Sequence, residues 1–168
     1  LEVIRIKTFQ PPTIEPSFFQ RAKYMLSFPM RASFYFLTKL RNTSTIILST
    51  PPASVLLVSF IARLLRKRIV IDVGDLWIDY AKIGHVNQKH GLLRKLIKSF
   101  EINCWKNSDV IICNSLVVKN EIEKIIGKKS STQINYFPFN VDSDFFKKQN
   151  TTLLNQIVYI GNYGSQQN

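Results

Sequence analysis

The sequence predicts an α/β domain with a Rossmann-like, doubly wound parallel sheet. Six short runs rich in Val and Ile alternate with longer helical segments along the chain. Most of these runs are continuously apolar, which is typical of strands buried on both faces of a parallel sheet. Strands separated by helices of this length indicate βαβ units with right-handed crossovers.

The expected elements follow from these runs and from the segments between them. The predicted strands are residues 3–7, 45–49, 68–73, 109–113, 133–137 and 156–160, and the predicted helices are residues 17–41, 53–66, 92–106 and 116–126. We expect Pro29 to kink or split the first helix, because proline lacks an N–H and clashes inside a helix. Asn114 or Ser115 is placed to cap the start of the last helix, and Gly127 to cap its end.

Length, composition and charge limit the function classes. A chain of 168 residues, 45% of them apolar, is long enough for one packed domain and is not a disordered tail. Lys and Arg number 23 against 11 Asp and Glu, a formal charge of +12. Such an excess favours contact with phosphates of nucleic acid, anionic lipid or a nucleotide-linked substrate. No nucleic-acid reading motif is present, so nucleic acid is not an expected partner.

The cysteines and histidines predict no metal site. Cys104 and Cys113 lie in apolar runs and are too few for a disulfide framework, which favours small buried thiols in a reducing compartment. His85 and His90 have no further Cys or His near them in the sequence to complete a zinc site.

The uncharged stretch 46–62 is short for a membrane span, and its two prolines would break a helix there, so strand, turn and buried helix is the better interpretation. Basic residues interleaved with apolar ones indicate helix faces that could rest on anionic lipid. The alternative is that these faces are simply solvated. The residues concerned are Arg63, Arg66, Lys67, Arg68, Arg94, Lys95 and Lys98.

In an open parallel sheet, ligands bind beyond the carboxyl ends of the strands, and the first candidate there is STPPAS, residues 49–54. Ser49, Thr50 and the free N–H groups of the next helix could receive an anion. The alternative is that Pro51 and Pro52 only shape a tight connection.

The second candidate follows the strand at 68–73. Asp75 and Asp79 flank Trp77 in a loop that contains Gly74. Their carboxylates could accept hydrogen bonds from sugar hydroxyls or act as a base, while the indole stacks on a ring. Alternatively, one Asp caps a helix and Trp77 belongs to the core. Asp72 is predicted to end the strand in a structural role.

The third candidate is Ser115, for which helix capping alone is a sufficient explanation. Five motifs of the chain occur in a characteristic order: STPP, DVGDLWID, DVIICNS (which ends at Ser115), INYFPFNVDSDFF and IVYIGNYGSQQ. In this order, they resemble family-4 glycosyltransferases of the GT-B fold. The resemblance is greatest to the subgroup that acts in surface polysaccharide and O-antigen assembly. It extends from about residue 24 to residue 167 and rests on the order of five motifs, none of them specific alone.

The resemblance implies a role for each matching residue. Pro51 and Pro52 match an S-P-P turn, Asp75, Trp77 and Asp79 match R-D-L-W-P-[DE], and Ser115 matches a strand-end serine, all on the acceptor side. Pro138, Val141 and Asp142 match the hinge. Gly161, Asn162, Gly164 and Gln167 match Y-x-G-N-x-G-x-x-Q of the donor domain, and the first three are expected near the donor diphosphate.

The resemblance also implies a domain organisation. Residues 1–142 are expected to form the N-terminal acceptor domain without its first strand, 143–155 a linker, and 156–168 the first strand and Gly turn of a truncated donor domain. Gly74 stands where the family usually has Arg, Ile78 where it has Pro, and Phe139-Asn140 replaces Asn-Gly. On its own, this stretch of chain is expected to be inactive.

The expected function is therefore that of a retaining glycosyltransferase. It would transfer a sugar from a nucleotide-sugar donor to a lipid-linked or polysaccharide acceptor, without a metal, at the cytoplasmic face of the cell membrane as a peripheral protein on anionic lipid. The alternative is a non-enzymatic Rossmann-like module, or degenerate remnant, that contacts a polyanion or a partner protein.

Overall fold

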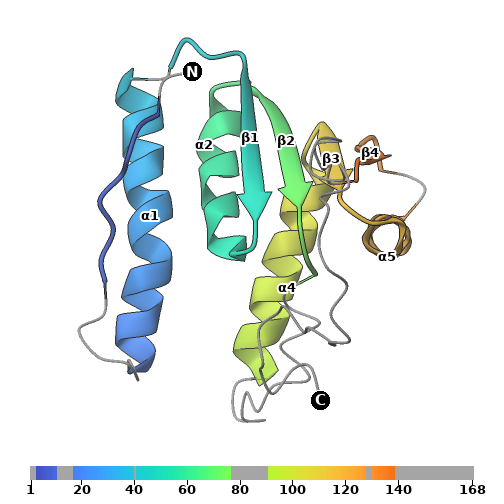
Figure 1. The fold of residues 1–168 in the computed structure, drawn as a ribbon, viewed down its shortest axis with the longest axis horizontal. Coiled ribbons are helices and arrows are strands. Elements are labelled where there is room, and N and C mark those ends of the chain that lie inside the picture. Colours follow the sequence, from blue (N-terminus) through green and yellow to red (C-terminus); the bar gives the residue numbers. More distant parts are fainter. Residues whose placement is uncertain (1–2, 11–16, 40, 77–90, 128–129, 139–168) are drawn as a thin grey trace, which may run out of the picture.

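A computed structural model of the protein describes residues 3–10, 17–39, 41–76, 91–127 and 130–138. In chain order, these contain α1 (Phe18–Lys39), β1 (Thr45–Thr50), the 3₁₀ helix η1 (Ala53–Leu56), α2 (Leu57–Leu64), β2 (Arg68–Val73), α4 (Gly91–Lys106), β3 (Val110–Cys113), α5 (Leu116–Ile126) and β4 (Gln133–Tyr136) (Figure 1).

The four strands form one sheet in the order β1-β2-β3-β4, and every neighbouring pair is parallel. The predicted Rossmann-like α/β fold is therefore confirmed. Because the strands follow one another across the sheet in sequence order, each connection between strands advances in the same direction. The predicted strand at 156–160 lies outside the described residues.

The centre of the core is a row of aliphatic side chains that crosses the sheet. Leu48, Ile71 and Ile111 are direct neighbours on β1, β2 and β3, and Ile71 and Ile111 are fully buried. Leu56, Ala62 and Ile122 from the helical layer join the same cluster. In Figure 1, α2 and α4 lie behind β1 and β2. Burying one such side chain contributes about 1.5–3 kcal/mol, so this row is a substantial source of stability.

Alternation along β1 shows which face the helices cover. Leu48 and Thr50 are buried, whereas Ile47 and Ser49 are exposed. Adjacent side chains of a strand point to opposite faces, so Leu48 and Thr50 belong to the helix-covered face and Ser49 to the other. On the central strand β2, Val70 is buried as well as Ile69 and Ile71.

The first predicted strand, residues 3–7, is wrong. Residues 3–10 have no regular secondary structure and lie against α1. The Phe9 N–H donates to the Ser27 hydroxyl at 3.1 Å, and the Arg31 guanidinium donates to the carbonyl of Lys7. The alternating pattern of these residues suits a strand, but a strand also needs a neighbouring edge, and here the neighbour is a helix.

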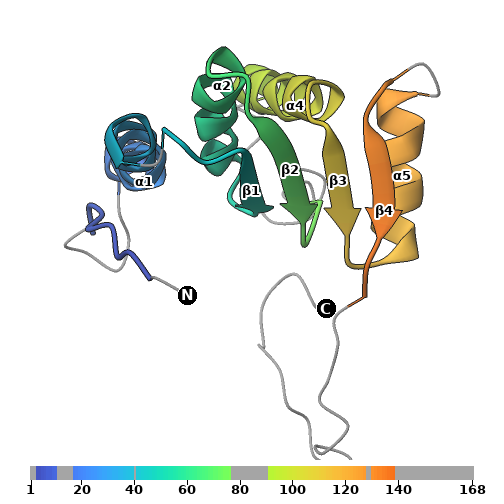
Figure 2. The same cartoon turned by 90° about the horizontal axis from the view of Figure 1, so that it is seen from above.

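Helix α1 runs through Pro29 without a break, so the predicted split is also wrong. Pro29 is fully buried and Phe36, two turns later, is 3% exposed. The helix packs against α2 and η1 along this side. The stabilisation gained by that packing offsets the missing N–H of proline. Figure 2 shows α1 at one end of the molecule, beyond β1.

The other helices lie close to their predicted positions. The predicted helix at 53–66 begins as η1 and ends at Leu64, and Arg66 has a positive φ of 54°. Helix α5 is capped as expected: the Ser115 hydroxyl accepts the Val118 N–H at 3.2 Å, and Gly127 follows with a φ of 76°. A positive φ is one that glycine adopts at little cost, which explains its place there.

A small polar cluster ties β4 to the turn between α4 and β3. The buried Thr132 hydroxyl lies 3.0 Å from the carbonyl oxygens of both Trp105 and Ser108. The Ser108 hydroxyl donates to the Trp105 carbonyl at 2.8 Å. Buried carbonyls that lose their donors are costly, so this cluster holds the start of β4 in place.

We expect Thr132→Val to lower the free energy of unfolding by about 1–3 kcal/mol, because it removes a buried donor while preserving side-chain shape. Urea denaturation followed by circular dichroism measures this change. Thr38→Val is the matched control, since Thr38 donates to the Phe34 carbonyl on an exposed part of α1. Equal effects of the two substitutions would contradict the anchoring role of Thr132.

Candidate functional site

Parallel pairing brings the carboxyl ends of all four strands to one edge of the sheet. Thr50, Val73, Cys113 and Tyr136 are consecutive partners across β1 to β4. The segments that carry the described candidate residues therefore leave the sheet side by side. In Figure 1 the arrowheads of β1 and β2 point to this edge, at the bottom of the sheet.

At the end of β1, Pro51 and Pro52 form a rigid connection to η1. Both are exposed and each is preceded by a cis peptide bond. The carbonyl of Pro52 accepts the Val55 N–H at 3.1 Å, so Pro52 is the N-cap of η1. Neither proline has an N–H to offer a ligand, which leaves them a shaping role and an apolar surface.

Ser49 and Thr50 direct their hydroxyl groups to β2. The Ser49 hydroxyl donates to Asp72 Oδ2 at 2.7 Å, and the Thr50 hydroxyl lies 3.3 Å from the carbonyl oxygen of Asp72. An anion at this point would compete for these protons and would face the Asp72 carboxylate. The arrangement therefore disfavours the anion-binding interpretation of STPPAS and favours a neutral, hydroxyl-rich ligand.

Asp75 follows β2 on the same edge and is exposed. The Gly74 N–H donates to the Thr50 carbonyl at 2.9 Å, which holds the two loops together. A Cβ at position 74 would lie 3.2 Å from that carbonyl oxygen, closer than ordinary contacts. This close approach is a physical reason for glycine at position 74.

Asp72 and Asp75 place two carboxylates within four residues at this edge. No described residue forms an ion pair with either of them. Ionised carboxylates accept hydrogen bonds and have no donor of their own. A ligand with several hydroxyl groups could satisfy both, whereas a phosphate would be repelled unless a cation came with it.

Ser115 follows β3 and is half-buried. Its oxygen accepts the Val118 N–H, so its structural role as the N-cap is clear. The hydroxyl proton remains available to a ligand, because a serine hydroxyl can donate and accept at once. Capping and ligand contact are therefore compatible at this position.

Several predicted site residues lie outside the described residues: Trp77, Asp79, Gly161, Asn162 and Gly164. The structure thus places Pro51, Pro52, Asp75 and Ser115 at the ends of three adjacent strands. Val141 and Asp142 of the expected hinge are likewise outside, whereas Pro138 follows β4 and is exposed.

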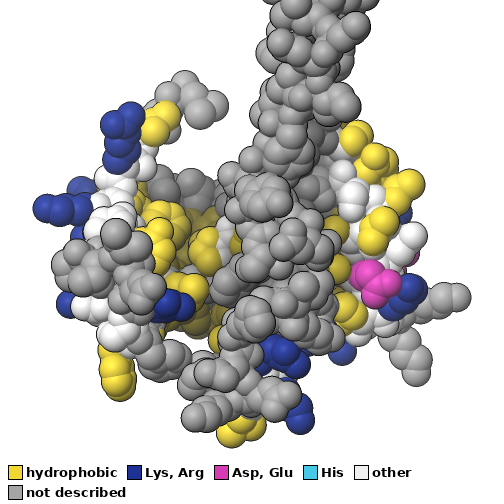
Figure 3. All heavy atoms as spheres, turned by 60° about the horizontal axis from the view of Figure 1, so that its bottom comes forward, with side chains coloured by type: hydrophobic (Ala, Val, Ile, Leu, Met, Phe, Trp, Pro, Cys, Tyr) yellow, Lys and Arg dark blue, Asp and Glu magenta, His cyan; other side chains and the backbone are white. Residues whose placement is uncertain are grey.

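Two features of this edge were not predicted from the sequence. The Ser49–Asp72 hydrogen bond depends on the register of β1 and β2, which no local pattern reveals. Tyr136 and Phe137, at the end of β4, are 42% and 66% exposed. Figure 3 shows hydrophobic side chains on the right of the molecule, over α5 and the end of β4. Exposed aromatic rings offer flat apolar surfaces on which sugar rings can stack.

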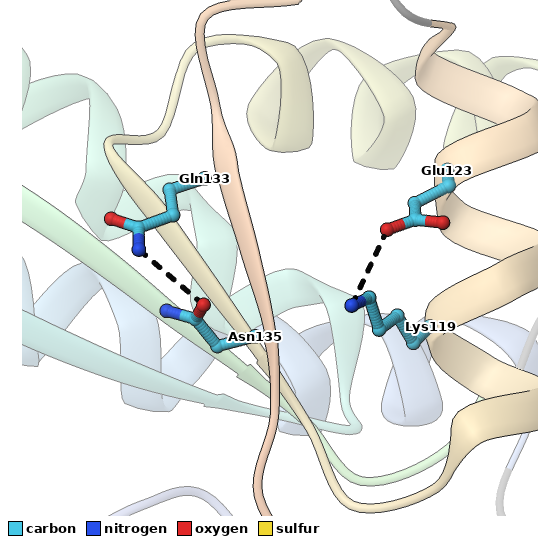
Figure 4. A network of polar contacts seen from close by, with 4 residues as sticks. All are labelled: Lys119, Glu123, Gln133 and Asn135. Atoms are coloured by element: carbon cyan, nitrogen blue, oxygen red, sulfur yellow. Dashed lines mark hydrogen bonds and ion pairs between the residues drawn. The ribbon is translucent and has the colours of Figure 1, made fainter.

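Strand β4 and helix α5 also carry pairs of polar side chains (Figure 4). Gln133 Nε2 donates to Asn135 Oδ1 at 3.4 Å along β4. On α5, Lys119 Nζ lies 3.6 Å from Glu123 Oε1. Both pairs lie within a single element at the surface, where such contacts add little stability.

Both thiols are held in the neutral form. Burial raises the pKa of Cys113, at the end of β3, to about 11, with Lys119 acting against this and Glu123 and Asp72 adding to it. Burial likewise raises the pKa of Cys104 to about 11, opposed by a hydrogen bond from Ser59. A neutral buried thiol is a poor nucleophile and a poor metal ligand.

Within the described part of the chain, no group of three or more His, Cys, Asp or Glu side chains is placed to hold a metal ion. None of the helices in those same ranges is long and apolar enough to cross a membrane.

We expect the folded protein to react slowly with a thiol reagent at pH 8 and much faster in denaturant, because both thiols are buried and neutral. The free energy of unfolding should fall as the pH rises from about 9 to about 11, since the unfolded thiols ionise first. Cys104→Ala and Cys113→Ala assign each contribution. Fast reaction of either folded thiol at pH 8 would contradict the neutral state.

Comparison with protein-family models and with curated proteins gives no match to this sequence. The resemblance to family-4 glycosyltransferases therefore stays a prediction from the order of the motifs.

Proposed function

We propose that this domain is the acceptor-side domain of a retaining GT-B glycosyltransferase. The enzyme transfers a sugar from a nucleotide donor to a lipid-linked or polysaccharide acceptor at the cytoplasmic membrane face. The observation that carries the proposal is the placement of Asp75 and of the Ser49–Asp72 pair at the carboxyl edge of adjacent parallel strands. Open parallel sheets bind ligands at this edge.

The chemistry of the edge suits a carbohydrate acceptor. Asp72 and Asp75 accept hydrogen bonds from sugar hydroxyls, and Tyr136 and Phe137 offer flat apolar surfaces to the rings. In the transfer, an acceptor hydroxyl oxygen bonds to the anomeric carbon while the bond to the nucleotide diphosphate breaks. The hydroxyl proton leaves with the departing diphosphate or passes to a base.

This domain would contribute to the rate mainly by orienting the acceptor, since holding two reactants in place removes much of the entropic cost of their meeting. Gly161, Asn162 and Gly164 remain the predicted contacts to the donor diphosphate. No metal is required in this proposal, and the co-substrate is the nucleotide sugar itself.

The alternative of a non-enzymatic module is favoured by one observation. Every charged side chain among the described residues before Asp72 is cationic. Such a surface could bind a polyanion without any catalysis. A module of this kind would bind in a salt-sensitive way and would show no preference for a glycan at the carboxyl edge.

Acceptor binding by Asp75 is the direct test of the site. We expect Asp75→Ala to weaken binding of lipid-linked or polysaccharide fragments by about tenfold, which corresponds to about 1.4 kcal/mol. Saturation-transfer NMR on fragments from membrane extracts measures the binding. Glu121→Ala is the matched control, because Glu121 lies on α5 and pairs with Lys124.

Transfer is tested separately with a panel of nucleotide sugars and membrane extracts, in a protein that carries the complete donor domain. Transfer that is equally fast in the Asp75→Ala variant would overturn the site assignment. Binding of polyanions with no glycan preference, together with no transfer by such a protein, would favour the non-enzymatic alternative.

A further inference from the structure

Helix α1 exposes a continuous apolar stripe to solvent. Leu26, Met30, Phe34 and Leu37 are spaced by four, four and three residues, so they lie on one side of the helix. Met30 and Phe34 are 68% and 70% exposed. The buried side of α1 carries Pro29 and Phe36 instead, so the stripe is separate from the contact with α2 and η1.

The extended segment 3–10 adds a second apolar wall beside this stripe. A groove of about 370 Å³ lies between them, with Ile4 and Ile6 on one side and Met30 and Phe34 on the other. Arg5 and Arg31 also line it. Arg31 holds the segment through the Lys7 carbonyl, and Lys23 Nζ lies 4.5 Å from the centre of the Phe9 ring.

Among the described residues, the charges in this region have a single sign. Arg5 and Arg31 line the groove, Lys7 and Lys23 belong to the same two segments, and the described residues 3–10 and 17–39 contain no acidic side chain. In Figure 3, Lys and Arg side chains project from the left part of the molecule, and hydrophobic ones lie beside them. An apolar stripe bordered by cations is the pattern of a helix that lies in a membrane interface.

We propose that α1 and segment 3–10 form a docking surface for an anionic lipid bilayer. Lys23, Arg5 and Arg31 contact lipid phosphates, and Met30 and Phe34 enter the boundary between headgroups and acyl chains. The aliphatic stems of the cations cover apolar surface while their charges stay at the phosphate level. Charge complementarity selects anionic over neutral lipid.

Position in the molecule supports this assignment. In both ribbon views α1 lies at one end, beyond β1 and away from the carboxyl edges of β2 and β3 (Figures 1 and 2). A bilayer on this end would leave the candidate acceptor edge uncovered. A nucleic acid would match the cations, but Met30 and Phe34 belong to a stripe with Leu26 and Leu37. A mostly aliphatic stripe suits acyl chains better than stacked bases, which favour aromatic rings.

This inference deepens the membrane part of the proposed function and places the contact on a helix that sequence patterns did not select. Lipid binding is measured without sugar transfer, so either proposal can fail while the other stands. Helix α4 provides the control surface for the experiment, because it also exposes apolar side chains next to cations. Leu92 and Leu96 are 74% and 59% exposed beside Arg94 and Lys95.

The experiment is sedimentation with vesicles of phosphatidylcholine alone, or of phosphatidylcholine mixed with phosphatidylglycerol, at low and high salt. We expect binding only to the mixed vesicles and a loss on adding salt. The pair Met30→Glu and Phe34→Glu should lower the bound fraction by about tenfold. The charge-matched pair Leu92→Glu and Leu96→Glu on α4 should change it by less than about twofold.

A second readout does not depend on loss of binding. Phe34→Trp should show a blue-shifted emission component with anionic vesicles, and brominated lipid should quench it. The unsubstituted protein, which already contains Trp77 and Trp105, gives the background. Circular dichroism of each variant confirms that the fold is retained.

Three results would overturn the proposal. The first is equal binding to neutral and anionic vesicles. The second is loss of binding in the α4 pair with normal binding in the α1 pair. The third is absence of lipid binding while the unsubstituted protein is oligomeric and the α1 pair is monomeric by gel filtration, which would make the stripe a contact between protein chains.

Discussion

Backbone hydrogen bonding of β2 to β1 on one side and to β3 on the other is the constraint on which the rest of the domain depends. It sets the register that aligns Leu48, Ile71 and Ile111 in the core. The same register places Ser49 beside Asp72 and brings the ends of the strands to one edge. A shift by one residue would turn the core side chains to the opposite face, so packing and site geometry are set together.

Much of the fold could be predicted from the sequence, because its strands are short apolar runs whose burial needs no special partner. Residues 68–73 and the helix from Leu116 to Ile126 with its two caps are clear examples. Residues 3–7 show the limit of this reasoning. Their alternation suits a strand, yet hydrogen bonds to Ser27 and from Arg31 hold the segment on α1. Pro29 shows another limit, since packing outweighs the local preference.

The candidate site was predictable only in part. Pro51, Asp75 and Ser115 could be found because ligand sites in this class follow strand ends, a position visible in the sequence. The Ser49–Asp72 hydrogen bond and the contact between Gly74 and the Thr50 carbonyl could not, because both depend on how two strands are paired. These contacts hold the Asp72 carboxylate beside Ser49 and leave little room for a side chain at position 74.

The position of β1 has a consequence for the behaviour of the protein in concentrated solution. Among the described strands, β1 ends the sheet, and Thr45–Thr50 contains no charged side chain. Ile47 is 65% exposed on it. Natural proteins usually protect such an edge with lysine, proline or a bulge, because unpaired backbone groups are a template for aggregation. Among the described strands, β1 is therefore where self-association is expected to begin, and Ile47→Lys is the simplest change that would oppose it.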